Sequence, residues 1–170
     1  MYLKRLLMVC ILTFANSLSF ANPPVEIIQS CKNMTAANNS IVMAELDGVG
    51  LNKTPDVNCR DQFENKINGH TYGWLTCDKK PYLIVADKRI SLESSTNFSV
   101  SPSIKPDTPI IQTALWWRID KADKSYLCIM SPLSENGAAA NAFQYFLIED
   151  AFDVNQKSYD IYFYFFNKDF

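Results

Sequence analysis

The sequence predicts a mainly β fold: a β-rich α+β domain, built as an antiparallel sandwich or curved sheet with one or two short helices and stabilised by disulfides. About eight short runs of β-branched and aromatic residues alternate with turn residues such as Gly, Asn, Asp and Pro. Few segments favour helix, and four cysteines follow the N-terminal segment. Short strands separated by turns are typical of antiparallel sandwiches.

Residues 1–21 have the three parts of a secretory signal peptide. Lys4 and Arg5 are basic, residues 6–14 are apolar, and residues 19–21 are Ser, Phe and Ala. The apolar run is too short for a bilayer-spanning helix, which needs about 20 residues. We therefore expect an exported chain, periplasmic or secreted, with a single β-rich domain over 22–170.

The charge of the expected domain argues against some partners. The chain has 16 Lys and Arg against 18 Asp and Glu, so without Lys4 and Arg5 residues 22–170 carry a net charge of −4. No basic tract is present, which argues against nucleic acid as a partner. Nothing after residue 21 is long and apolar enough to span a membrane as a helix.

The cysteines predict disulfide bonds. An even number of cysteines in an exported chain favours two disulfides, and residues 22–170 contain Cys31, Cys59, Cys77 and Cys128. The spacing contains no C-x-x-C pair and the chain has one histidine, so no metal site is predicted. We favour the pairs Cys31–Cys59 and Cys77–Cys128, and the other pairings stay open.

The first expected elements are a helix and a strand. Residues 25–33 follow two prolines, with Glu26 in the first turn and Lys32 near the end, as suits a short helix. Its apolar face would carry Ile27, Ile28 and Cys31. Residues 41–46 are predicted to form a short strand.

The middle of the chain reads as a meander of short antiparallel strands. Residues 61–67 are predicted to form a helical turn, because Phe63 and Ile67 are four residues apart. Asn68-Gly69 is a strong turn signal. The strands that follow are expected at 71–77, 82–86 and 90–92.

Residues 93–108 are the main irregular stretch and are rich in Ser, Thr and Pro. A long surface loop is the favoured interpretation for a chain of this size. Because long ordered loops often carry function, this stretch is a candidate site.

Residues 109–130 predict a β-hairpin with arms at 110–120 and 125–130. If Asp120 lies opposite Ser125, Trp117 lies opposite Cys128. The face of Trp117 is apolar enough to form the core.

The other face of this hairpin carries Trp116 and Arg118 and is half polar. It is therefore either covered by another element or open to a partner.

Two further elements complete the chain. Residues 142–150 fit either a helix or a strand, and the hairpin-like loop after them favours the strand. Residues 158–166 are a strand by composition. One face of this strand would carry Tyr159, Ile161, Phe163 and Phe165, and the other Tyr162, Tyr164 and Phe166.

Two sets of candidate site residues follow. Large amphipathic rings suit a binding surface, so Trp116, Arg118, Tyr162 and Tyr164 are candidates for binding a partner. His70, Glu64 and Arg60 lie close in sequence and are weaker catalytic candidates. No nucleophile motif accompanies them, and no cofactor is predicted.

These observations favour an exported, non-enzymatic domain that binds another protein. An inhibitor or immunity protein against a hydrolase or toxin is its concrete form. The alternatives are a small secreted hydrolase, using His70 with nearby carboxylates, and an envelope-associated structural component.

Overall fold

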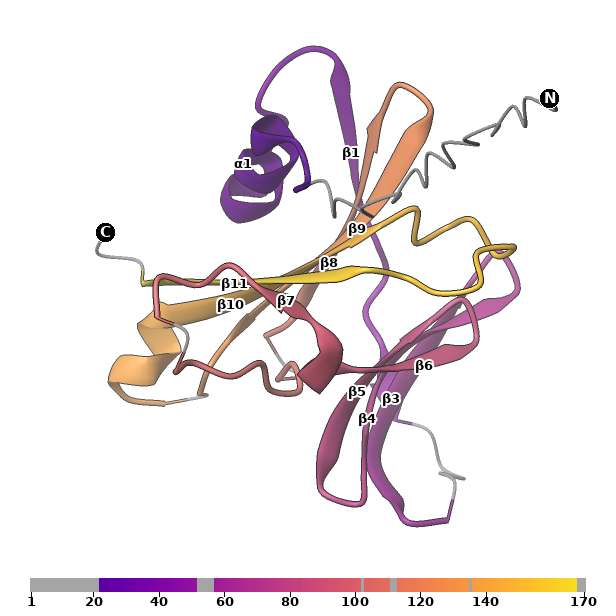
Figure 1. Ribbon diagram of the computed structural model, residues 1–170, viewed down its shortest axis with the longest axis vertical. Helices are drawn as coiled ribbons and strands as arrows, with labels where there is room; N and C mark the ends of the chain where they lie inside the picture. Colours follow the sequence, from indigo (N-terminus) through magenta and orange to yellow (C-terminus); the bar gives the residue numbers. More distant parts are fainter. Residues whose placement is uncertain (1–21, 52–56, 102, 111–112, 135, 168–170) are drawn as a thin grey trace, which may run out of the picture.

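The computed structural model describes residues 22–51, 57–101, 103–110, 113–134 and 136–167 (Figure 1). The predicted signal peptide, 1–21, lies outside these residues. The fold is mainly β, with two sheets, one short α-helix and two disulfides. The predicted fold class is confirmed. Within the described ranges, no helix is long and apolar enough to cross a membrane.

The first sheet has six strands in the order β1-β8-β9-β10-β11-β7. Neighbouring strands are antiparallel except β11 and β7, which are parallel. Short 3₁₀ helices precede β7 (η1, Leu92–Ser94) and β10 (η2, Ala138–Asn141). The strands are β1 (Ile41–Glu45), β7 (Thr96–Asn97), β8 (Leu115–Lys121), β9 (Lys124–Pro132), β10 (Ala142–Glu149) and β11 (Ile161–Asn167).

The second sheet is a five-stranded antiparallel meander in chain order. Two-residue turns join its last four strands. Both residues of each turn have positive φ, as in Asn68-Gly69, which matches the twist of a hairpin. The strands are β2 (Gly50–Leu51), β3 (Cys59–Ile67), β4 (His70–Cys77), β5 (Lys80–Val85) and β6 (Lys88–Ser91).

The main core lies between the two sheets. Trp74 of β4 and Trp116 of β8 stack with ring centroids 5.5 Å apart. Apolar side chains from both sheets surround this pair, including Tyr72, Leu83, Leu127, Phe146 and Phe163. Figure 1 shows the five-stranded sheet below the six-stranded sheet, with α1 (Val25–Asn33) on the far side of the latter.

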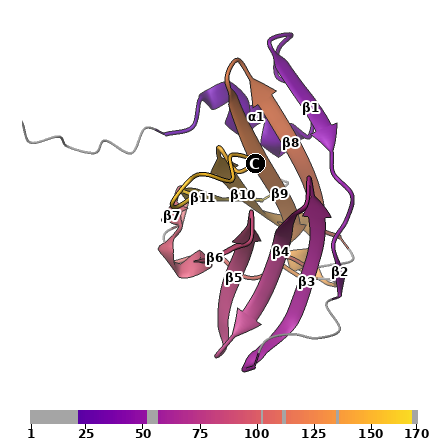
Figure 2. The ribbon, with the colours of Figure 1, turned by 90° about the vertical axis from the view of Figure 1, so that its right-hand side faces the viewer.

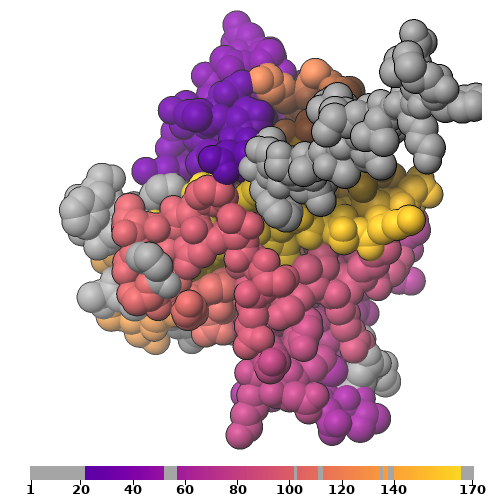
Figure 3. Space-filling model, viewed as in Figure 1, coloured from indigo at the N-terminus to yellow at the C-terminus, as the bar shows by residue number. Residues whose placement is uncertain are grey.

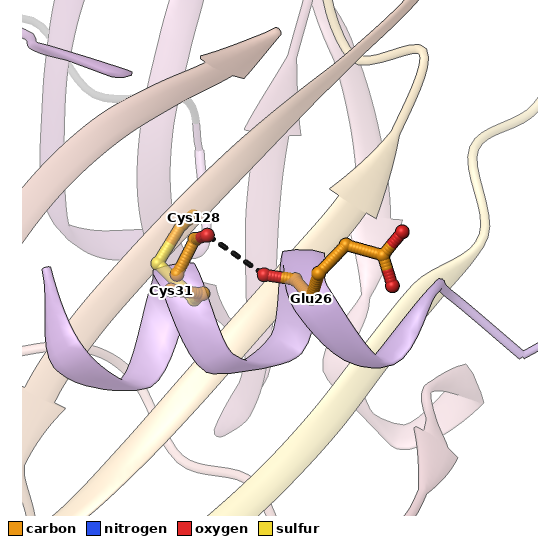
Figure 4. The surroundings of a disulfide bond; sticks show 4 residues. Glu26, Cys31 and Cys128 are labelled. Atoms are coloured by element: carbon orange, nitrogen blue, oxygen red, sulfur yellow. Dashed lines mark hydrogen bonds between the residues drawn. A yellow bond between two sulfur atoms is a disulfide. The ribbon is translucent and has the colours of Figure 1, made fainter. Parts of the chain in front are cut away.

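A second core lies between α1 and the six-stranded sheet. Ile27 is fully buried there, and Cys31 of α1 forms a disulfide with Cys128 of β9 (Figure 4). The helix matches the predicted bounds, and Glu26 also pairs with Lys121 of β8. The hydrogen bond from Lys121 lowers the pKa of Glu26. Both faces of the six-stranded sheet are therefore covered.

The register of the predicted β8–β9 hairpin is confirmed, but its first arm begins at Leu115 rather than at 110, because the N–H groups of Thr113 and Ala114 donate to the Ile110 carbonyl in a turn. Asp120 lies opposite Ser125, and Trp117 lies opposite Cys128. The two faces of this hairpin belong to different cores. The Trp117 face packs toward α1 in the second core, and the Trp116 face packs against the five-stranded sheet in the main core.

The strand expected at 142–150 is confirmed as β10. The last strand is confirmed from Ile161 onward, whereas 158–160 lie outside it; Ile161 and Phe163 face the main core, and Tyr162 and Tyr164 face α1.

Two further expectations about the fold are wrong. Residues 61–67 form part of strand β3 rather than a helical turn, because they pair with β4 across the Asn68-Gly69 turn. The favoured disulfide pairing is also wrong, since the bonds are Cys31–Cys128 and Cys59–Cys77. The second bond joins residues that lie directly opposite each other in β3 and β4.

Candidate functional site

The three aromatic rings expected on a binding surface are buried. Trp116 is 3% exposed between the sheets, whereas Tyr162 and Tyr164 are 2% and 6% exposed on the opposite face. Phe98, from the segment after β7, stacks on Tyr164 with ring centroids 5.5 Å apart. The expectation that these residues form an exposed aromatic surface is therefore wrong, because other elements cover both sides of the sheet at these positions.

Arg118, the fourth expected binding residue, is already bonded to neighbouring side chains of the fold. Its Nε donates to both carboxylate oxygens of Asp120, at 2.9 and 2.8 Å. Its guanidinium lies 4.8 Å from the centre of the Phe152 ring. These contacts hold the Arg118 side chain against the edge of the main core. About a third of the side chain is still exposed.

The expected catalytic residues do not converge. His70 lies opposite Ile67, whereas Glu64 lies opposite Gly73 and Arg60 opposite Thr76. With about 3.3 Å per residue along a strand, Glu64 is roughly 10 Å and Arg60 roughly 20 Å from the His70 end of the hairpin. Glu64 instead accepts a hydrogen bond from Gln62, and Arg60 pairs with Asp61.

His70 has a different carboxylate beside it, one that the sequence did not single out. Its Nδ1 lies 2.6 Å from Oδ2 of Asp87, in the β5–β6 turn. The backbone N–H of Thr71 donates to Oδ1 of Asp87 at 2.8 Å. The hydrogen bonds from Thr71, and then the one from His70, lower the pKa of Asp87 to about 2. The pair fixes the orientation of an exposed imidazole.

The irregular stretch expected as a candidate site does line a groove of about 360 Å³. The stretch lies at the surface in Figure 3, in pink and salmon. Much of the groove's polar surface is already bonded. Glu93 pairs with Lys80 at 3.2 Å, and the Asn97 side chain bonds both the Ile104 carbonyl and the Ser99 N–H. The lining residues are Pro81, Glu93, Ser95, Asn97, Lys105 and Pro106.

Within the described residues, the outer edge of β1 presents backbone N–H and C=O groups that no neighbouring strand bonds. Leu46 N–H donates to the Trp116 carbonyl at 2.8 Å, and the β1–β8 register continues from this pair. Because hydrogen-bonded and non-hydrogen-bonded pairs alternate in an antiparallel ladder, Val42 and Ala44 bond β8. The N–H and C=O groups of Met43 and Glu45 therefore point away from the sheet.

The four sheet edges differ in how they are protected. β2 and β7 have only two residues each, and β6 carries Lys88 and Arg89. Short strands and basic side chains discourage pairing with another chain. β1 has five residues, with neither lysine nor proline. In Figure 2 it forms the outer margin of its sheet, with none of the described elements beyond it.

The side chains along β1 would select what pairs with it. Val42 is 65% exposed, and Ala44 and Glu45 are exposed beside it. Asp47 follows and is also exposed. The edge thus offers an apolar position at one end and two carboxylates at the other.

Metal binding gains no support from the parts of the chain that the structure describes, where no group of three or more His, Cys, Asp or Glu side chains could hold an ion. All four cysteines of these parts are in disulfides. Compared with protein-family models, with curated proteins and with solved structures, the chain matches none of them.

Proposed function

We propose that this chain is an exported protein-binding domain that takes up an extended segment of its partner along the outer edge of β1. The observation that carries the proposal is the outer edge of β1, which pairs with none of the other described strands on that side and presents backbone donors and acceptors of Met43 and Glu45 outward. An added strand would bond these groups in the same way as β8 bonds the other side of β1. The two disulfides support an oxidising environment.

The edge favours a particular partner chemistry. A segment that pairs with β1 would place a β-branched or other apolar side chain beside Val42. It would place a basic side chain near Glu45 and Asp47, whose carboxylates are exposed. Backbone bonds would supply affinity, and these two positions would supply specificity. An inhibitor or immunity protein that engages an edge or loop of a hydrolase or toxin is one concrete form of this function.

The hydrolase alternative has no comparable support. His70 and Asp87 form a pair, yet Glu64 and Arg60 lie elsewhere along the hairpin. General acid–base chemistry needs both groups within reach of one reacting atom.

The proposal is tested by capture with variants of the edge. Tagged wild-type protein, Val42→Lys and Met43→Pro would be incubated with an extract of the cells that make the protein, and retained proteins identified by mass spectrometry. Met43→Pro removes an outward N–H and leaves the bonds from Val42 and Ala44 to β8 in place. We expect a partner that is retained by wild type and lost from both variants.

Val100→Lys is the matched control, because Val100 is 84% exposed on a different segment. It should retain the partner as wild type does. In the isolated complex, amide hydrogen exchange at Met43 and Glu45 should slow. A partner retained equally by Val42→Lys and Met43→Pro would refute binding at this edge. Self-association that depends on Val42 would make a second copy of the chain the occupant, contrary to the proposal.

A further inference from the structure

The two disulfides of this protein have opposite surroundings. Cys31 and Cys128 are 2% and 0% exposed, and they lie in the core between α1 and the six-stranded sheet. Cys59 and Cys77 are partly exposed and belong to neither core. The second bond is therefore the more accessible of the two to a reductant in solution, whereas the first is enclosed between α1 and the sheet.

The Cys59–Cys77 bond lies on the face of the five-stranded sheet that points away from the six-stranded sheet, although Leu75 on the same face of β4 is 0% exposed. Side chains alternate along β4, so Cys77 points to the face opposite that of Trp74, which is in the main core. The six-stranded sheet packs on the Trp74 face, and α1 contacts β8, β9 and β10 instead. None of the described helices lies over the disulfide.

The hairpin is held independently of this disulfide. A β-bulge between Arg60 and Phe63 separates the short ladder at Cys59 and Cys77 from the longer ladder that ends at the Asn68-Gly69 turn. The longer part is fixed by its turn and by Phe63 packing on Trp74, with ring centroids 5.7 Å apart. Loss of the S–S bond would free the strand end only as far as the bulge.

Charges of both signs surround the bond, and Lys80 is the cation that lies on its side of the sheet. Arg60 follows Cys59 with 72% of its side chain exposed, and Lys80 lies directly opposite Cys77 in β5. Both cations also pair with carboxylates, Arg60 with Asp61 and Lys80 with Glu93. Nearby cations stabilise a thiolate, the form in which a cysteine leaves during exchange and attacks in the reverse reaction.

We propose that Cys59–Cys77 is a site of thiol–disulfide exchange for a dithiol reductant, and that its reduction releases residues 59–62 at the start of β3 while the fold persists. A thiolate of the dithiol attacks one Sγ, the S–S bond breaks, and the electron pair leaves on the other Sγ, which takes up a proton. The second thiol of the reductant resolves the mixed disulfide. The dithiol becomes a disulfide and both cysteines become thiols, a two-electron exchange.

Graded reduction under native conditions tests the proposal. The purified protein would be treated with dithiothreitol, or with a thioredoxin-class protein dithiol, then alkylated and mapped by mass spectrometry. We expect Cys59 and Cys77 to be labelled about tenfold or more faster than Cys31 and Cys128, with the near-ultraviolet circular dichroism unchanged. Equal labelling rates, or labelling only together with loss of tertiary structure, would overturn it.

A second measurement reports the released strand end. Trypsin cuts after Arg60, and that bond should become several-fold more sensitive on reduction as the short ladder opens. The double variant Cys59→Ser/Cys77→Ser should fold and show the same sensitivity without reductant.

The matched variant Cys31→Ser/Cys128→Ser should show no selective increase at Arg60, because its missing bond anchors α1. Failure of the Cys59→Ser/Cys77→Ser variant to fold, or wild-type resistance at Arg60 in the reduced protein, would contradict the proposal.

Discussion

At the scale of single residues, Asp87 joins two turns at one end of the five-stranded sheet. It lies in the β5–β6 turn and accepts bonds from Thr71 and His70, next to the β3–β4 turn. These bonds favour its ionised form and lower its pKa from 3.8 to about 2. Asp87 thus stabilises the fold at any pH at which it is ionised in both the folded and unfolded chain.

The sign of its pH dependence follows from that shift. Because the pKa of Asp87 is lower in the folded chain, its contribution is present above about pH 4 and is lost as the pH falls toward 2. We expect Asp87→Asn to lower the free energy of unfolding at neutral pH by roughly 1 kcal/mol or less, since the site is half exposed. The difference from wild type should shrink between about pH 4 and pH 2.

Urea denaturation across this pH range measures the difference. Asp123→Asn, at the exposed β8–β9 turn, is the control and should leave the stability curve unchanged. A wild-type–variant gap that grows as the pH falls would contradict the assignment.

Residue environments were predictable only in part. The alternation of Trp116 and Trp117, and of Tyr162 and Phe163, across opposite faces is confirmed, because strand periodicity is local. Which face would be open was not predictable, since that depends on two layers far apart in sequence. His70 was recognised, but Asp87 was not, because a loop aspartate 17 residues away has no local signal.

At the scale of elements, the β3–β4 hairpin depends on Gly73. A Cβ at this position would collide with the Phe63 carbonyl oxygen and would come within 2.8 Å of the Glu64 Cα. Both are backbone atoms of the neighbouring strand, so no side-chain rotation relieves the contact. The close approach lies just beside the bulge between Arg60 and Phe63.

We expect Gly73→Ala to destabilise the protein by about 3 kcal/mol, because the strands must separate to admit the methyl group. Chemical denaturation measures the loss, and Gly50→Ala in β2 is the matched control, since nothing lies within 4 Å of the methyl group it would add. Equal stability of the two variants would show that the β3 backbone is free to move.

Elements with short, specific turn signals were the easiest to predict. The hairpins at Asn68-Gly69 and at the β8–β9 turn are predicted correctly, because the residues that determine a turn are adjacent in the sequence. The polar stretch 61–67 wrongly predicts a helical turn, because the spacing of Phe63 and Ile67 fits both a helix and a strand, and only pairing with β4 decides between them.

At the scale of the whole molecule, the two sheets share one core. The Trp74–Trp116 stack joins the five-stranded sheet to the six-stranded sheet, and Trp116 is 3% exposed. A cavity at this contact therefore affects both sheets. We expect Trp116→Ala to cost about 3–5 kcal/mol.

Amide hydrogen exchange resolves how this loss is distributed. Protection should fall together in β4 and β9, which lie on opposite sides of the stack. A response confined to the six-stranded sheet would mean that the two sheets unfold separately.

The disulfide pattern has a consequence for how the chain matures. Cys31–Cys128 encloses Cys59–Cys77, and its two cysteines are 97 residues apart. In a chain that emerges from its N-terminus into an oxidising compartment, Cys31 meets Cys59 and Cys77 long before Cys128 exists as a partner. Any early bond from Cys31 is then non-native and must be reshuffled, on a scale of seconds to hours. Maturation is therefore expected to need disulfide isomerisation in each chain in which Cys31 pairs before Cys59 and Cys77 have bonded to each other.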